Sequence, residues 1–144
     1  MVEQDTIRLL RECDAGVKMG ISSIKDVLDY VRDEDLRTTL TDCKAAHEKL
    51  DVEISGLLHS YHDDGKEPAA MAKAMSHAKT GVKLAMNESD ATIADLMTDG
   101  CNMGVKSLSK YLNKYKAADE KSKDITKRLI DVEQRLTFDM QKYL

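Results

Sequence analysis

The chain has 144 residues, of which 42% are hydrophobic and 33% charged, and its formal net charge is -4. This length suffices for one domain with its own core, and the composition excludes a disordered chain. Lys and Arg are interleaved with Asp and Glu, which argues against the clustered basic surface that nucleic-acid binding requires. With 4% aromatic residues and no Trp, the core must be built from aliphatic residues and Met, as in helical bundles.

No apolar run approaches the ~20 residues that a membrane span needs, so we expect no membrane partner. The N-terminus, Met-Val-Glu-Gln-Asp, is acidic and predicts no signal peptide. The three Cys residues fall on three different predicted helices, which is typical of a reducing, cytoplasmic location rather than of a disulfide framework.

The first predicted hairpin covers residues 6–62. Apolar residues recur at spacings of three and four through 6–32 and again through 36–61, which predicts two helices with buried seams. The first seam is Leu10, Asp14, Val17, Ile21, Ile24, Leu28 and Val31, and the second is Leu36, Leu40, Cys43, His47, Leu50, Ile54, Leu57 and Tyr61. The junction Asp33-Glu34-Asp35 is short, so the two helices should be antiparallel, with Asp33 or Asp35 as the N-cap.

A crossover helix is predicted over residues 69–86. Gly65 is the expected stop before it, and Pro68 suits the opening turn of a helix, where a missing N–H costs nothing. The segment 87–90 ends this helix, with Ser89 or Asp90 as the next N-cap.

The second predicted hairpin covers residues 91–143, with a polar turn near Ala118. Its seams are Ile93, Met97, Gly100 or Cys101, Gly104, Leu108, Tyr111 and Tyr115, then Ile125, Leu129, Val132, Leu136 and Met140. Two short hairpins joined by a long crossover predict a single all-α domain over 1–144 with the ferritin-like antiparallel four-helix arrangement. An up-down bundle with a fifth helix is the alternative.

A short phrase occurs twice, as Leu50-Asp51-Val52-Glu53 and as Ile130-Asp131-Val132-Glu133. In ferritin-like metal proteins, Glu-x-x-His on a helix holds half of a two-metal site, because positions i and i+3 share one face. Here Gly56 and Leu136 stand where the His residues would be. Glu53 and Glu133 are therefore candidate metal ligands or, more plainly, partly exposed residues in ion pairs. The repetition itself suggests a duplicated hairpin, or chance similarity.

Asp14 is a further candidate ligand because it lies on an apolar seam, where a charge needs a partner. In a hairpin centred near Asp33, Asp14 lies level with Glu53. Two carboxylates at the same level of a bundle repel each other, so they are expected to bind a cation or to share a proton. The alternative is that the bundle is open to water at this level and both carboxylates are hydrated.

His47 completes the candidate metal set of Asp14, His47, Glu53 and Glu133. With Cys43 and Asp51 it forms an i, i+4, i+8 face that suits a soft metal, although a buried His and Cys are also ordinary core residues. A phosphotransfer role for His47 is disfavoured, because the Lys and Gly that follow the His in such modules are out of register. His59 and His62, near a helix end, are candidates for adventitious metal binding.

Glycines and methionines carry two further expectations. Gly16 with Gly20, and Gly100 with Gly104, each place two glycines on one helical face, which predicts close packing of two helices or of two protomers. The methionines at positions 71, 75, 86, 97 and 103 are expected to fill gaps in the core, with an adaptable partner-binding face as the alternative.

Four segments carry a resemblance to a small, largely uncharacterised bacterial ferritin-like family of unknown function. They are Asp14-Ala-Gly16, Tyr30-Val-Arg-Asp-Glu-Asp-Leu36, Gly65-Lys-Glu-Pro68 and Leu108-Ser-Lys-Tyr111. The resemblance implies a metal-binding bundle, but acidic residues expected near 100–104 and the His of the last helix are absent here. We therefore expect a non-catalytic structural or interaction protein without a cofactor, as a homodimer or with a protein partner. The alternative is a di-iron or manganese oxidase or storage protein.

Overall fold

The computed structural model describes residues 2–144, apart from the side chains of residues 70 and 71, and within that range the chain is all-helical. The five α-helices are α1 (Val2–Leu28), α2 (Glu34–Ser60), α3 (Ala70–Met86), α4 (Asp90–Lys114) and α5 (Glu120–Met140), followed by a 3₁₀ turn over Gln141–Tyr143. The expected elements are all present. The first helix begins and ends about one turn earlier than expected, and Met1 lies outside the described residues.

Three of the helices begin at a capping residue, whose side-chain oxygen accepts a hydrogen bond from a free backbone N–H group of the first turn. Asp33 accepts a hydrogen bond from the backbone N–H of Leu36 at 2.9 Å. Ser89 does the same for Thr92 at 3.2 Å, and Asp119 accepts from Ser122 N at 2.8 Å. Of the alternatives left open by the sequence, the caps are thus Asp33 and Ser89.

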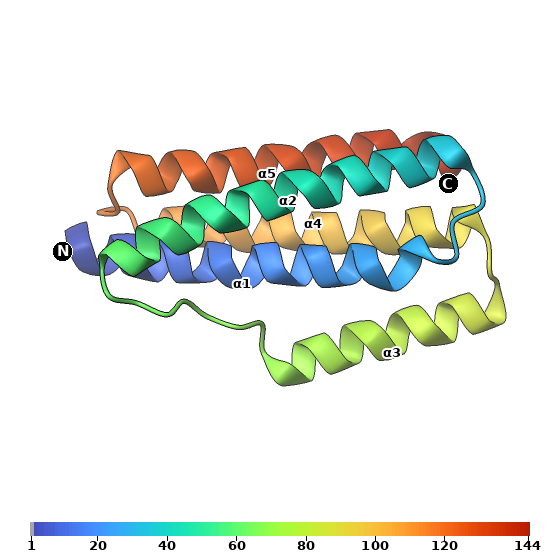
Figure 1. Ribbon diagram of the computed structural model, residues 1–144, viewed down its shortest axis with the longest axis horizontal. Helices are drawn as coiled ribbons and strands as arrows, with labels where there is room; N and C mark the ends of the chain where they lie inside the picture. The colour runs from blue at the N-terminus through green and yellow to red at the C-terminus, as the bar shows by residue number, and fades with distance from the viewer. Residues whose placement is uncertain (1) are drawn as a thin grey trace.

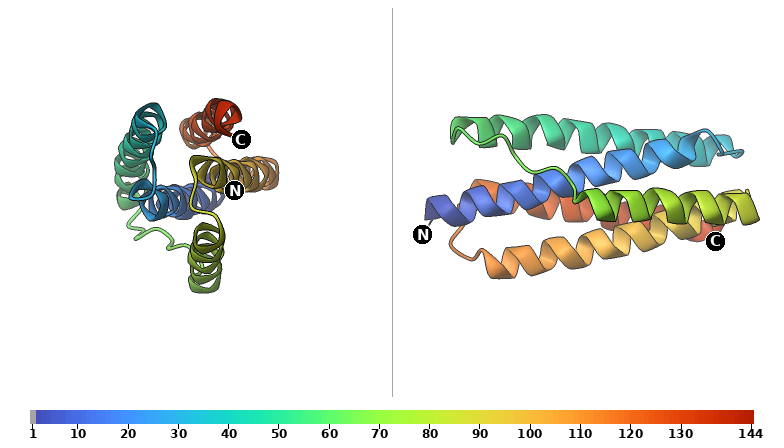
Figure 2. Two further views of the ribbon diagram at one scale, coloured as in Figure 1. Left: turned by 90° about the vertical axis from the view of Figure 1, so that its right-hand side faces the viewer. Right: turned by 90° about the horizontal axis from the view of Figure 1, so that it is seen from below.

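The helices form two antiparallel hairpins that lie side by side (Figure 1). Helix α1 packs against α2, and α4 packs against α5; across the hairpins, α1 contacts α4 and α5, and α2 contacts α5. The segment 61–89 returns the chain along the length of the molecule, so that α2 and α4 run in the same direction. Helix α3, which belongs to this segment, lies outside the other four helices and contacts α1 and α4 (Figure 2).

The seams predicted for α1, α2, α4 and α5 form the core. Their buried members are Leu10, Asp14, Val17, Ile24, Val31, Leu36, Leu40, Cys43, His47, Leu50, Ile54, Ile93, Met97, Cys101, Leu108, Ile125, Leu129, Leu136 and Met140. A period of three to four residues is therefore sufficient to find the inward face of each of these helices.

The methionine expectation is largely wrong. Met97 is buried, but Met75, Met86 and Met103 are 66%, 83% and 69% exposed, and the side chain of Met71 lies outside the described part. The core is filled instead by branched aliphatic residues, and the methionines of α3 whose side chains are described face away from it.

Among the described residues, no helix is both long enough and apolar enough to cross a membrane.

Candidate functional site

A polar layer crosses the middle of the core. The buried apolar residues form two clusters, one containing Ile24, Cys43, Cys101 and Leu136 and the other containing Val17, Leu50, Leu108 and Leu129. Between these clusters each helix of the two hairpins contributes one non-aliphatic residue. The polar layer consists of Gly20 from α1, His47 from α2, Gly104 from α4 and Glu133 from α5.

His47 and Glu133 meet within this layer. Their side chains are 1% and 10% exposed, and Nε2 of His47 lies 3.1 Å from Oε1 of Glu133. The other ring nitrogen, Nδ1, lies 2.8 Å from the backbone carbonyl oxygen of Cys43, one turn earlier in α2. Because both neighbours are acceptors, both ring nitrogens act as donors, which is the hydrogen-bonding pattern of a protonated imidazole.

The electrostatics agree with a charged pair. Burial, taken alone, lowers the pKa of His47, but hydrogen bonds to Cys43 and Glu133 and the charge of Glu133 outweigh it and raise the pKa to about 10. His47 is thus an imidazolium at neutral pH, held against a buried carboxylate. A charge buried here is tolerated because it is paired and its donors are satisfied.

Two cysteines border the layer on one side. Burial, together with the nearby negative charge of Glu133, strongly raises the pKa of the Cys101 thiol. Sγ of Cys43 lies 3.6 Å from Nδ1 of His47. A thiol held in its neutral form is a poor nucleophile and a poor metal ligand, because the thiolate is the reactive species.

The glycines make room for the pair. A Cβ atom at position 20 would lie 2.6 Å from Nε2 of His47, and one at position 104 would lie 3.4 Å from the carboxylate carbon of Glu133. At Gly16 the nearest such contact is 4.0 Å away, and at Gly100 there is none within 4 Å. Within the chain, the glycine spacing therefore does not reflect two closely packed helix backbones. It accommodates the polar side chains of α2 and α5.

Asp14 lies in a separate polar site, near the end of α2. Its side chain is 2% exposed, and Oδ2 accepts hydrogen bonds from Lys18 Nζ at 3.0 Å and from the backbone N–H of Lys66 at 2.9 Å. Gly65 has a φ of +85°, and a Cβ atom there would collide with Oδ2 of Asp14. Asp14 thus fastens the segment after α2 onto α1.

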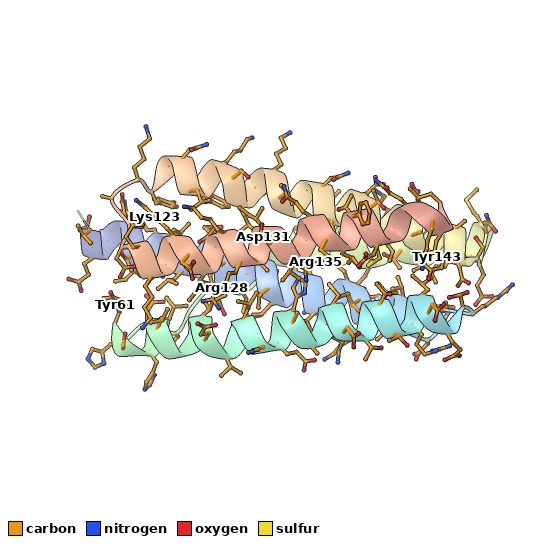
Figure 3. The ribbon with its side chains drawn as sticks, turned by 90° about the horizontal axis from the view of Figure 1, so that it is seen from above. Tyr61, Lys123, Arg128, Asp131, Arg135 and Tyr143 are labelled. Atoms are coloured by element: carbon orange, nitrogen blue, oxygen red, sulfur yellow. The ribbon has the colours of Figure 1, made fainter. Side chains whose placement is uncertain are left out.

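The expected pairing of Asp14 with Glu53 is wrong. Arg128 of α5 (labelled in Figure 3) donates two hydrogen bonds to the carboxylate of Glu53, with nitrogen–oxygen distances of 2.8 and 3.0 Å. These hydrogen bonds lower the pKa of Glu53. The carboxylate that neighbours Asp14 is Asp51, whose pKa is raised by burial and by the charge of Asp14. Oδ1 of Asp51 is buried and has no hydrogen-bond partner among the described residues.

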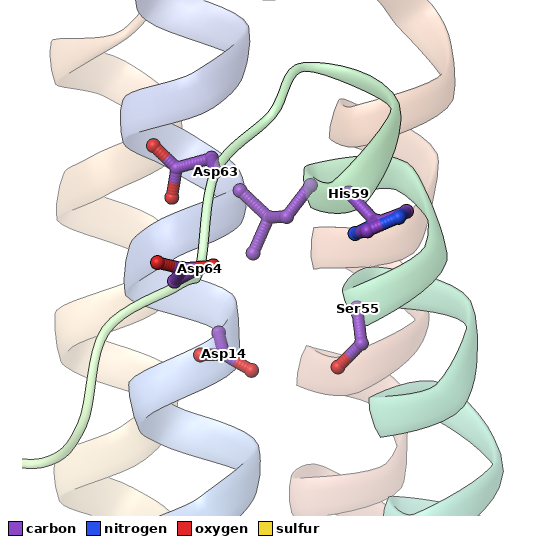
Figure 4. Close-up of a pocket in the computed structure, with 6 residues that line it drawn as sticks. Asp14, Ser55, His59, Asp63 and Asp64 are labelled. Atoms are coloured by element: carbon purple, nitrogen blue, oxygen red, sulfur yellow. The ribbon is translucent and has the colours of Figure 1, made fainter.

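A shallow pocket of about 190 Å³ lies beside Asp14 (Figure 4). It is lined by Asp14, Ser55, Leu58, His59, Asp63 and Asp64. Asp63 is bound by Arg11 of α1, so part of its negative charge is neutralised within the protein. His59 lies in the last turn of α2, whereas His62 follows the helix with a φ of 58°, so the two imidazoles do not share a helical face.

Of the four candidate ligands, the structure therefore brings together only His47 and Glu133. Asp14 and Glu53 lie at two other places, each with a basic partner of its own. The sequence pattern places Asp51 on the same helical face as His47, but it does not indicate that Asp51 neighbours Asp14 or that Cys101 neighbours Glu133.

Across residues 2–144, no three or more His, Cys, Asp and Glu side chains gather in a way that could hold a metal ion. Comparison with known proteins finds no family model, curated protein or solved structure that matches the chain.

Proposed function

We propose that the chain is a ferritin-like four-helix bundle from a bacterial cytoplasm with a structural or protein-interaction role and no catalytic activity. Support for the ferritin-like class comes from the connectivity, in which two antiparallel hairpins are joined by a long return segment and α2 and α4 run in the same direction. The four segments that resemble the ferritin-like family point the same way.

The composition of the polar layer carries the proposal. A carboxylate-bridged di-iron site needs a Glu from each of two helices and a Glu and a His from each of the other two. The layer supplies one His, one Glu and two glycines. The residues present therefore do not fit a two-metal centre at this level of the bundle.

The hydrogen bonds of His47 support the same conclusion. A metal ligand must offer an unprotonated ring nitrogen, but in His47 Nδ1 faces the Cys43 carbonyl oxygen and Nε2 faces Glu133. Binding a cation here would require the imidazolium to lose a proton and the carboxylate to lose its partner. The pair is built as an internal structural element.

Elemental analysis of protein purified without a His tag tests this proposal. We expect no stoichiometric iron or manganese, either as isolated or after anaerobic incubation with the ferrous or manganous ion followed by desalting. The double variant His59→Ala/His62→Ala serves as a control for adventitious binding near the end of α2. Stoichiometric metal that survives in this variant but is lost in Glu133→Gln would overturn the proposal and favour an oxidase or storage protein.

A further inference from the structure

Helix α3 presents an apolar face to solvent. Its exposed residues recur at spacings of three, four and three along the helix, and we call them the α3 stripe: Met75, Ala78, Val82, Ala85 and Met86. Met75, Val82 and Met86 are 66%, 59% and 83% exposed. A continuous apolar stripe of this kind marks a packing surface, because isolated exposed apolar residues are common but ordered rows of them are not.

The opposite side of α3 contacts the body through one core residue, Leu84, and through polar side chains. Among the described side chains of α3, Thr80 and Leu84 are buried. Lys79 and Lys83 pair with Asp99 and Asp95 of α4 at 3.6 and 3.0 Å, and His77 pairs with Asp26 of α1 at 2.6 Å. Most helices gain their stability by packing an apolar face. Helix α3 packs only Leu84 and Thr80 of its described side chains inward, and the residues of the α3 stripe remain exposed to solvent.

We propose that the α3 stripe is the contact surface for a second copy of this chain, with the two α3 helices packed antiparallel about a twofold axis. This inference rests on the proposed interaction role and names its partner. With the axis near the middle of the helix, Met75 lies opposite Met86 of the second copy and Ala78 lies opposite Val82. Large residues then face small ones at the centre, which allows interdigitation. Such isologous contacts are the commonest form of protein self-association.

The charges beside the stripe allow this pairing. The segment 70–86 contains three lysines and no acidic residue, and an unneutralised lysine row would repel its own copy. Lys79 and Lys83, which flank the stripe, are however paired with Asp99 and Asp95 of the same chain. The other flank carries Gly81 and alanines, so the two helices can approach closely there.

The same ion pairs disfavour an anionic membrane as the occupant. Amphipathic helices that bind such surfaces rely on free Lys and Arg along the polar face. Here two of the three lysines of α3 are already paired, and the whole chain has a net charge of -4.

The size of the stripe sets the strength of the contact. A helix of 17 residues is about 25 Å long, and a strip about 10 Å wide buries roughly 500 Å² in total across two copies. This is below the ~1,200 Å² of stable complexes, so the dimer should be reversible and depend on concentration.

Sedimentation equilibrium of the full chain over a wide range of concentrations tests the inference. We expect a reversible monomer–dimer equilibrium whose dissociation constant rises about 100-fold or more in Val82→Glu, because two unpaired carboxylates would be buried near the axis. The matched control is Val52→Glu, a Val on α2 that is 75% exposed and lies outside the stripe. It should leave the dissociation constant unchanged.

Cross-linking provides a readout that does not depend on a disruptive substitution. A short bis-maleimide should join two copies of Val82→Cys but not of Val52→Cys, because Cys13, Cys43 and Cys101 are buried. Far-UV circular dichroism checks that Val82→Glu keeps its helix content. If the helix content falls, the cross-linking of Val82→Cys tests the inference instead.

Three outcomes would overturn the inference. They are a chain that stays monomeric at all concentrations without cross-linking, a dimer equally weakened by Val52→Glu, and a monomer that binds vesicles rich in phosphatidylglycerol through the stripe. Metal content measured on the same preparations separates this inference from the proposed function. A metal-free monomer overturns only the α3 contact, whereas stoichiometric metal overturns the non-catalytic role whatever the oligomeric state.

Discussion

At the scale of single residues, His47 and Glu133 form the most consequential contact in the molecule. Each would be costly to bury alone, and each is acceptable because the other is 3.1 Å away. The sequence indicates both residues, His47 from its place on a seam and Glu133 from the repeated phrase. It does not indicate their pairing, because they are 86 positions apart and the register between two hairpins is not visible in a helical period.

The charged pair makes stability depend on pH. The pKa of His47 is about 10 in the folded chain, against 6.5 for a free imidazole, so the folded state holds the proton more tightly. This stabilisation is complete below about pH 6.5 and is lost as the pH rises toward 10, with a limiting slope of about 1.4 kcal/mol per pH unit.

Urea unfolding at pH 6, 8 and 9.5 measures this effect, and we expect the free energy of unfolding to fall across the series. The variant His47→Leu/Glu133→Met is the control, since it removes the pair but keeps the buried thiols, whose raised pKa values also reduce stability above about pH 9. An equal decline in the wild type and in this variant would contradict the assignment.

Gly20 and Gly56 offer a matched pair of substitutions within helices. Gly20→Ala places a methyl group against Nε2 of His47 and should destabilise the fold by about 1–3 kcal/mol. Gly56→Ala meets no atom within 4 Å and should stabilise the fold by about 0.5–1 kcal/mol, as Ala does in an open helix. Thermal unfolding followed by circular dichroism checks both, and a stabilised Gly20→Ala would show that the His47 ring does not lie against Gly20.

At the scale of elements, the sequence predicts all five helices, but it predicts the buried face of only four of them. The seams of α1, α2, α4 and α5 are readable because aliphatic residues recur every three or four positions and face one core. In α3 the same spacing exists, but Met75, Val82 and Met86 face outward, whereas Leu84 packs into the core and His77 and Lys83 pair with residues of α1 and α4. Those contacts join distant parts of the chain, so no local pattern could reveal them.

The segment 61–69 shows a similar limit in the second polar site. The seam of the first helix identifies Asp14 as a buried charge, but its partners are Lys18 and the backbone of Lys66, in a loop whose path the sequence does not predict. Glu53, the expected partner, lies two residues beyond Asp51, and on a helix two residues rotate a side chain by about 200°. Asp51 is therefore a partly buried neighbour of Asp14, whereas Glu53 is half-exposed and bound to Arg128.

Gly65→Ala tests how this loop is fastened. Position 65 has a positive φ and faces Oδ2 of Asp14, so the substitution should strain the backbone and displace the loop, at a cost of about 1–3 kcal/mol. Gly56→Ala, at an open position of α2, serves as the control and should be neutral or stabilising. Limited proteolysis within 61–69 should accelerate in Gly65→Ala alone; equal rates in both variants would show that Asp14 does not fasten the loop.

At the scale of the whole molecule, the polar layer interrupts the core at one level in four helices. The apolar residues on either side form separate clusters, and Val132 is a partly buried side chain that packs against both. The halves are thus joined by four continuous helices, by Val132 and by one charged pair.

This interruption bears on folding cooperativity. A polar layer with two glycines leaves few apolar contacts between the two halves of the core. Unfolding of one half therefore removes few contacts from the other. We therefore expect the two apolar clusters to behave as two unfolding units along one set of helices. The pair of His47 and Glu133 sits at their junction, where its strength decides whether the chain unfolds in one step or in two.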